Sequence, residues 1–103
     1  MASPKKMTPD EVSARLPSVP GWLVANGKLH KEFRFRDFVQ AFSFMTGCAL
    51  IAERLNHHPE WSNVYSWVVV DLVTHSADGI SELDFEFARL LNTLASGGGM
   101  ELQ

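Results

Sequence analysis

The spacing of hydrophobic and polar residues predicts three helices and four strands in this chain. The first helix is expected to begin after Thr8, because Thr-Pro-Asp-Glu supplies an N-cap, a proline for the first turn and a capping-box glutamate. Pro17 and Pro20 are expected to end it, since proline cannot continue a helix. Residues 1–7 are predicted to form a flexible N-terminal arm.

A β-hairpin is predicted next. Residues 21–24 precede Asn26-Gly27, a pair that accepts the positive φ angles of a tight primed turn. In the return strand, residues 28–36, Leu29 and Phe33 alternate with charged residues. The pattern therefore predicts a sheet with one buried face and one solvated, charged face.

The longest helix is predicted over residues 37–56, with Asp37 as N-cap and Gln40 as its capping-box partner. Its hydrophobic residues form two stripes, so the apolar arc is wider than contact with one sheet face requires. This excess indicates a buried helix or a contact between subunits. The stripes are Ala41, Phe44, Cys48, Ile51 and Leu55, and Phe38, Phe42, Met45, Ala49 and Ala52.

Residues 61–74 are rich in β-branched and aromatic residues but too long for one ordinary strand, so we divide them near Tyr65-Ser66. Ser81 is expected to cap the last helix, with Asp84 in the box position, and residues 97–103 to form a flexible tail. The order of elements predicts an α+β domain over residues 8–96. It would have two layers, a four-stranded antiparallel sheet with three helices on one face.

Composition narrows the class of protein. The chain has 103 residues, a net charge of -3 and one cysteine, which suit a single domain in a reducing compartment. No basic field indicates direct binding to nucleic acid. The N-terminus lacks the apolar core of a signal peptide, and no apolar run approaches the ~20 residues that span a membrane. We therefore expect a cytoplasmic protein with no membrane partner.

Three histidines are candidates for chemistry. His57 and His58 follow the long helix and precede Pro59, so both rings should sit at a fixed turn. Glu53, four residues before His57, could orient that ring if the helix continues so far. His75 ends a strand, where catalytic groups often lie.

Taken singly, each histidine is better explained as a helix cap or a strand end. The aromatic residues Trp22, Trp61 and Tyr65 add flat apolar walls, and the combination favours a small-molecule pocket. Three histidines could also hold zinc, but adjacent side chains diverge and no His-Glu-x-x-His motif is present. Metal-free acid–base chemistry is therefore favoured. A zinc hydrolase and a binding module that docks a partner through its long helix are the alternatives.

Several segments together resemble the pterin-4a-carbinolamine dehydratase family, and the similarity runs from Thr8 to Ala95. The family signature is His-His-Pro, an aromatic residue, a strand-end histidine and an aspartate. The matching segments are ERLNHHPEW (residues 53–61), NVY (63–65), Thr74-His75, Gly79 and Asp84, with Gly21-Trp22 and Phe44-Met45-Thr46 also similar.

The resemblance implies a lyase that dehydrates 4a-hydroxytetrahydrobiopterin to quinonoid dihydropterin without a cofactor or metal. That reaction recycles the tetrahydropterin of aromatic amino acid hydroxylases. The resemblance also implies a homodimer or homotetramer. Some animal members bind a homeodomain transcription factor, so a protein partner on the long helix is a further expectation.

The resemblance also suggests roles for residues of the site. We expect His57 and His75 to transfer protons at the 4a-hydroxyl, His58 to hold the pterin and Glu53 to orient His57. Asn56 stands where some members have Asp, and Val73 replaces a small polar residue. The expected sets are catalytic His57, His58, His75 and Glu53; substrate-binding Asn56, Val73, Thr74, Trp22 and the histidines; and supporting Asp84, Pro59 and Trp61.

Overall fold

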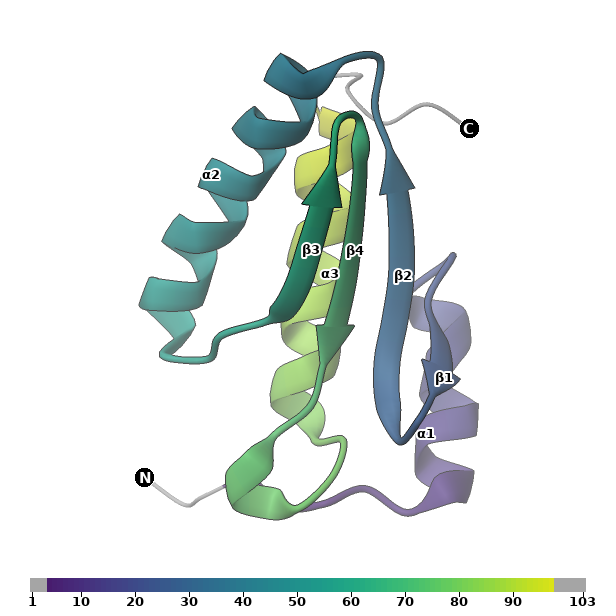
Figure 1. Ribbon diagram of the computed structural model, residues 1–103. Helices are drawn as coiled ribbons and strands as arrows, with labels where there is room; N and C mark the ends of the chain where they lie inside the picture. The colour runs from purple at the N-terminus through teal and green to yellow at the C-terminus, as the bar shows by residue number, and fades with distance from the viewer. Residues whose placement is uncertain (1–3, 98–103) are drawn as a thin grey trace.

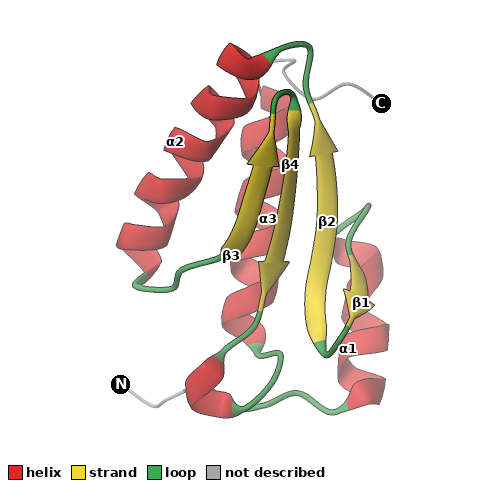
Figure 2. Ribbon diagram, viewed as in Figure 1, coloured by secondary structure: helices red, strands yellow, loops and turns green. Residues whose placement is uncertain are grey.

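The computed structural model describes residues 4–97, which form one antiparallel sheet covered by helices (Figures 1 and 2). Most of the predicted arm and tail, residues 1–3 and 98–103, lies outside the described residues. Within the arm, the Met7 N–H donates to the Ile80 carbonyl at 2.8 Å, and the Met7 side chain packs against the core.

The order of elements is the predicted one, helix-strand-strand-helix-strand-strand-helix, and it confirms the α+β fold. The sheet has the strand order β1-β2-β4-β3, and each neighbouring pair is antiparallel. α1 and α3 lie behind the sheet in Figure 1, and α2 packs against both α3 and β4. The elements are α1 (Pro9–Arg15), η1 (Leu16–Ser18), β1 (Leu23–Ala25), β2 (Lys28–Arg34), α2 (Phe38–Leu55), β3 (Glu60–Val64), β4 (Trp67–Leu72), η2 (His75–Ala77) and α3 (Glu82–Gly97).

Local sequence signals place most of the boundaries. Thr8 and Glu11 form the predicted capping box of α1, and Asp37 caps α2 by accepting the Gln40 N–H at 2.9 Å. The Gln40 side chain, however, accepts the Arg36 N–H instead of closing a box on Asp37. Asn26 and Gly27 have φ angles of 54° and 75°, as a primed two-residue hairpin turn requires.

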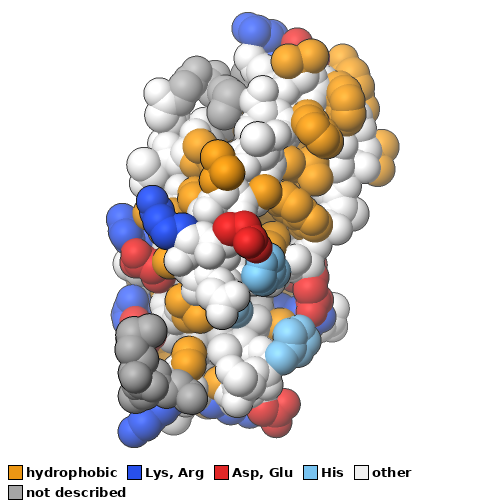
Figure 3. Space-filling view, turned by 90° about the vertical axis from the view of Figure 1, so that its left-hand side faces the viewer, with side chains coloured by type: hydrophobic (Ala, Val, Ile, Leu, Met, Phe, Trp, Pro, Cys, Tyr) orange, Lys and Arg blue, Asp and Glu red, His pale blue; other side chains and the backbone are white. Residues whose placement is uncertain are grey.

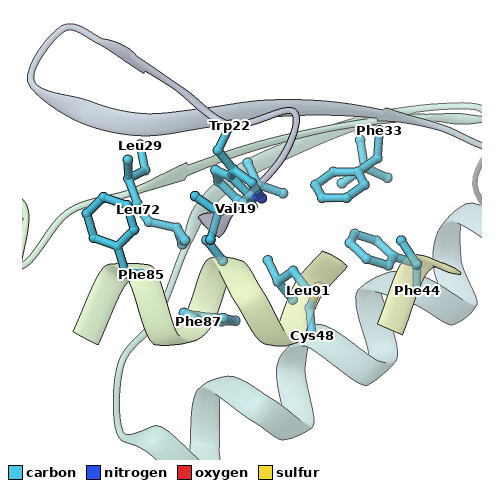
Figure 4. Packing of buried hydrophobic residues seen from close by; sticks show 14 of the residues in the cluster. Val19, Trp22, Leu29, Phe33, Phe44, Cys48, Leu72, Phe85, Phe87 and Leu91 are labelled. Carbon is cyan, nitrogen blue, oxygen red and sulfur yellow. The ribbon is translucent and has the colours of Figure 1, made fainter. Parts of the chain in front are cut away.

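The core lies between the sheet and the helices (Figure 4). Alternation along β2 and β4 directs hydrophobic side chains to this side, where they meet residues of α2 and α3. Cys48 packs here as predicted, and burial raises the pKa of its thiol far above the usual range. The fully buried side chains include Leu29, Phe33, Phe44, Cys48, Val68, Val70, Leu72, Phe85, Phe87 and Leu91.

One side of α2 stays uncovered in the single chain. The first predicted stripe faces the core, with Ala41, Phe44 and Cys48 fully buried. The outer face carries Phe38, Val39, Phe42 and Leu50, which are between 46% and 71% exposed. Figure 3 shows hydrophobic side chains gathered over the upper part of this side of the molecule. The part of the apolar arc that does not face the core is therefore exposed to solvent.

A buried polar cluster joins three elements at the lower end of the molecule. Asp84 is fully buried in the first turn of α3, and its Oδ1 lies 2.5 Å from His57 Nε2. Its Oδ2 accepts from Thr74 Oγ1 at 2.8 Å and from the Ser81 N–H at 2.9 Å. The Thr74 and Ser81 hydroxyls lie 2.7 Å apart. Asp84 thus makes the predicted capping interaction and also ties the end of α2 and the end of β4 to α3.

The outer face of the sheet, away from the helices, carries interstrand charge pairs. His30 Nδ1 lies 2.8 Å from Oδ1 of its register partner Asp71, and Nε2 lies 3.3 Å from Glu32 Oε2. The Asp71 hydrogen bond raises the pKa of His30 above its ordinary value of 6.5; burial opposes this and Glu32 adds to it. His30 thus lies on the charged face predicted for this strand, with two carboxylates around its ring.

Removing the Asp84 carboxylate should destabilise the fold strongly. Asp84→Ala leaves His57, Thr74 and the Ser81 N–H without their buried partner, so the free energy of unfolding should fall by about 3–5 kcal/mol. Urea unfolding followed by circular dichroism measures this. Asp84→Asn keeps the shape and one acceptor oxygen, which can still accept from Thr74 and the Ser81 N–H, and should lose less. A loss under about 1 kcal/mol for the alanine variant, as for an exposed pair, would contradict the cluster's structural role.

The His30 pairs should make part of the stability depend on pH. Because the folded pKa is raised, this contribution is fully present below the unfolded pKa and is lost as pH rises through the folded pKa. The difference in unfolding free energy between wild type and His30→Gln should therefore be larger at about pH 5.5 than at about pH 9. Comparing wild type with His30→Gln at each pH removes the contributions that the other titrating groups make to the unfolding free energy of both proteins. A difference that grows with pH would contradict the assigned pairing.

Candidate active site

A cleft of about 560 Å³ lies at the same end of the molecule as the buried cluster, where α2 and β4 end and α3 begins. His57, His58 and His75 all line it, so the structure brings the three predicted histidines together. Histidine side chains are visible below the hydrophobic region in Figure 3. The lining residues are Pro4, Leu55, Asn56, His57, His58, Val73, Thr74, His75, Ser76 and Leu83.

The turn after α2 gives the first two histidines their different directions. Asn56 adopts the left-handed conformation with φ of 50°, and the His57 N–H reaches back to the Ala52 carbonyl at 3.0 Å. Asparagine tolerates this conformation better than most residues, and the bond closes a Schellman-type helix end. Pro59 then prevents the helix from resuming, and the chain enters β3. His57 is buried, whereas the His58 side chain is 59% exposed.

The carboxylate partners differ from those predicted. Glu53 Oε2 lies 2.6 Å from His58 Nε2, not beside His57, and His57 is paired with Asp84. The prediction that Glu53 orients His57 is therefore wrong. It assumed that α2 continues through residue 57, but the helix ends at Leu55 and the left-handed turn directs His57 toward α3.

His75 has its own carboxylate partner. It is the first residue of η2, and Val73 and Thr74 separate it from the end of β4. Its side chain is 79% exposed, and its Nε2 lies 3.1 Å from Glu60 Oε2. The other oxygen of Glu60 pairs with Lys28 Nζ across the outer face of the sheet. The Lys28 hydrogen bond holds the pKa of Glu60 below its usual range, with burial opposing and His75 contributing, and it raises the pKa of Lys28. Glu60 could not be identified from the sequence, because only the sheet register brings it beside His75.

The loop that carries Thr74 and His75 is fixed by its own backbone. The Thr74 N–H donates to the Gly79 carbonyl at 2.9 Å, and the Gly79 N–H returns to Thr74 at 3.3 Å. Asp78 takes the left-handed conformation with φ of 57° to close the loop. These bonds use the Thr74 backbone groups, and its hydroxyl is committed to Asp84 and Ser81. Thr74 therefore shapes the cleft.

The prediction that Trp22, Trp61 and Tyr65 form walls of the pocket is wrong, because none of them lines the cleft. Trp22 is 5% exposed in the core, where its ring lies edge-on to Phe33 and its Nε1 donates to Asn92 Oδ1 at 2.9 Å (Figure 4). Trp61 packs on the core side of β3, and Tyr65 is 63% exposed in the β3–β4 turn, at the opposite end of the hairpin from His75. The apolar lining instead comes from aliphatic side chains and one proline, Leu55, Val73, Leu83 and Pro4.

The size of the cleft suits a ligand of two fused rings, since small-molecule sites commonly measure about 300–1,000 Å³. Size does not single it out, because grooves of about 530 and 500 Å³ occur beside α1. The gathering of three histidines distinguishes it from both. Each of these rings has one nitrogen on a carboxylate, so each ring is oriented by a charged partner.

No group of three or more His, Cys, Asp or Glu side chains within residues 4–97 is arranged to hold a metal ion. No helix in the same range is long and apolar enough to cross a membrane.

Comparisons with known proteins identify the family of this chain. Residues 5–94 match the family described as Pterin 4 alpha carbinolamine dehydratase. A protein of Solibacter usitatus, provisionally named pterin-4-alpha-carbinolamine dehydratase, is 50% identical over 92 residues, covering 89% of this chain and 97% of its own. A protein of Sinorhizobium fredii with the same provisional name is 49% identical over 96 residues, covering 91% of each chain.

A solved structure gives the same result. The crystal structure of a Brucella melitensis protein described as a transcriptional coactivator/pterin dehydratase superposes with a TM-score of 0.86 at 42% identity. The match covers 89% of this chain and all of that one. The resemblance noted from the sequence is thereby confirmed, and the chain belongs to the pterin-4a-carbinolamine dehydratase family, a family of hydro-lyases.

Proposed function

We propose that this protein dehydrates 4a-hydroxytetrahydrobiopterin to quinonoid dihydrobiopterin by histidine acid–base catalysis, and so recycles the tetrahydropterin of an aromatic amino acid hydroxylase in the cytoplasm. The observation that carries the proposal is the convergence of His57, His58 and His75 in one cleft, each ring paired with a carboxylate. Family membership supports the reaction class.

The reaction needs two proton movements. The C4a–O bond breaks as the hydroxyl receives a proton and leaves as water, while N5 loses its proton and forms a double bond to C4a. Imidazole suits both tasks near neutral pH, and each positioned acid or base contributes about 10²–10⁴-fold.

The hydrogen bonds suggest how the roles divide. Asp84 accepts hydrogen bonds from Thr74 and Ser81, so we assign the facing His57 Nε2 as a donor, which leaves Nδ1 as the nitrogen that can accept a proton. We assign His57 as the base for N5. His75 is largely exposed and can regain a proton from water, which suits the acid that protonates the hydroxyl. His58, oriented by Glu53, would hold the pterin together with Asn56 and the surface of Val73.

The proposal extends to self-association. The exposed residues Phe38, Val39, Phe42 and Leu50 on α2 form an apolar surface on one helix. Burial of such a surface against a second copy would remove it from water. A homodimer or homotetramer through α2 is therefore proposed. Docking of another protein on this helix, the second candidate function, would use the same surface.

Replacement of His75 tests the catalytic role. We expect the wild-type protein to accelerate the decay of the 4a-carbinolamine in a stopped-flow assay and His75→Ala to lower kcat by about 100-fold. The exposed ring contributes little to packing, so the unfolding midpoint should stay unchanged. His30→Gln, which alters a histidine outside the cleft, is the matched control and should keep full activity. An unchanged rate in His75→Ala would remove His75 from the mechanism, and a wild-type protein without effect on the decay would refute the proposed function.

Charging the outer face of α2 tests the assembly. Phe42→Glu should shift the sedimentation equilibrium toward the monomer, because it places a charge in the surface that a second copy would bury. Leu23→Ser, which changes an exposed leucine on edge strand β1, is the control and should leave the assembly intact. A wild-type protein that is monomeric at all concentrations would contradict self-association through α2.

A further inference from the structure

The carboxylate beside His75 differs from the other two carboxylates of the site. Asp84 is fully buried and Glu53 stands on the same helix end as its histidine. Glu60 belongs to neither group: it begins β3 and, within residues 4–97, lies outside the lining of the cleft. It contacts His75 with one oxygen and Lys28 with the other.

The sheet holds Glu60 in this position. Lys28 begins β2 and Glu60 begins β3, with β4 between them, so the contact spans the outer face of the sheet. The register partner of Glu60 on β4 is Asp71, whose carboxylate is engaged by His30, and Glu32 contacts that same ring. The charged groups that face Glu60 are thus Lys28 and His75, with Asp71 beside them already paired.

His75 needs such a partner more than the other two histidines do. Its side chain is 79% exposed, compared with 10% for His57, and a side chain with few packing contacts samples several rotamers. Glu60 is 43% exposed and is itself held by Lys28, so it offers a fixed acceptor. A carboxylate accepts only, so His75 donates Nε2–H to it and directs Nδ1 elsewhere.

We propose that Glu60, braced by Lys28, is a positioning residue that fixes the ring of His75 with Nδ1 directed to the substrate. This inference rests on the proposed function for its effect on turnover. The orientation of the ring, however, can be measured without substrate.

The kinetic test compares two substitutions of Glu60. Glu60→Ala should lower kcat by about tenfold, because a His75 ring that samples several rotamers is seldom directed at the substrate hydroxyl. KM should stay within about twofold. Glu60→Gln should lower kcat by only about threefold, since its amide oxygen can accept the same N–H from His75 while its NH2 group cannot accept from Lys28. Glu32→Ala removes a carboxylate from the same sheet face that pairs with His30 instead, and it should change nothing. Equal rates for wild type, Glu60→Ala and Glu60→Gln would overturn the proposal.

A double-mutant cycle tests whether Lys28 holds Glu60 in place. Lys28→Met should lower kcat by about threefold in the wild-type background and should have no further effect once Glu60 is alanine, because the two residues act through one contact. Lys28→Arg should restore the rate. Losses that simply add would show that Lys28 acts independently of Glu60 and would overturn its assigned role.

Ring order separates this proposal from the proposed function. NMR side-chain couplings should report one dominant rotamer for His75 in the wild-type protein and several in Glu60→Ala, with Glu32→Ala unchanged. The same rotamer populations in all three proteins would overturn the positioning role, whatever the activity. A fixed ring in a protein that does not accelerate carbinolamine decay would leave the positioning result standing and refute the proposed function alone.

Discussion

The candidate site depends on one buried carboxylate, Asp84, whose two oxygens are both hydrogen-bonded. Asp84 lies in the first turn of α3, is fully buried, and accepts from His57, Thr74 and the Ser81 backbone. A buried charge is costly unless it is hydrogen-bonded on several sides, and these three donors come from the ends of α2 and β4 and the start of α3. The carboxylate therefore fixes three chain ends relative to one another. Two of these ends carry the catalytic candidates His57 and His75, so the geometry of the cleft follows from the requirement to satisfy one charge.

The three histidines represent a gradient from interior to surface, and this gradient agrees with the division of labour proposed for them. His57 is buried against α3, His58 is half-exposed over the last turn of α2, and His75 stands at the rim. The buried ring is held by a carboxyl group that also accepts from Thr74 and the Ser81 N–H, which favours donation from its Nε2. The exposed ring is in contact with water, and Glu60 is the side chain that contacts its Nε2. The same cleft is thus lined by one buried and one largely exposed histidine, which suits the base and acid roles proposed for them.

The fold was readable from the sequence because its signals are local. The Asn26-Gly27 turn, the Thr8 capping box and the alternation of β2 each depend on residues a few positions apart. The site was readable only in part. The three histidines were identified, but Glu53 was assigned to the wrong ring, because one left-handed residue, Asn56, redirects the chain after α2. Trp22 was placed in the pocket because an aromatic side chain beside titratable groups suits a ligand, yet its indole is satisfied by Asn92, 70 positions away. Glu60 was not identified because its contacts with Lys28 and His75 depend on the register of the strands, which no short segment encodes.

The path of the N-terminal segment has a practical consequence. Met7 is tied to Ile80, and Pro4 belongs to the wall of the cleft, so the chain leaves the described domain beside the histidines. The final turns of α3 lie at the other end of the molecule (Figure 1). An affinity tag or fusion partner joined ahead of Pro4 would crowd the entrance to the cleft, whereas the same addition after Gly97 would leave that entrance clear.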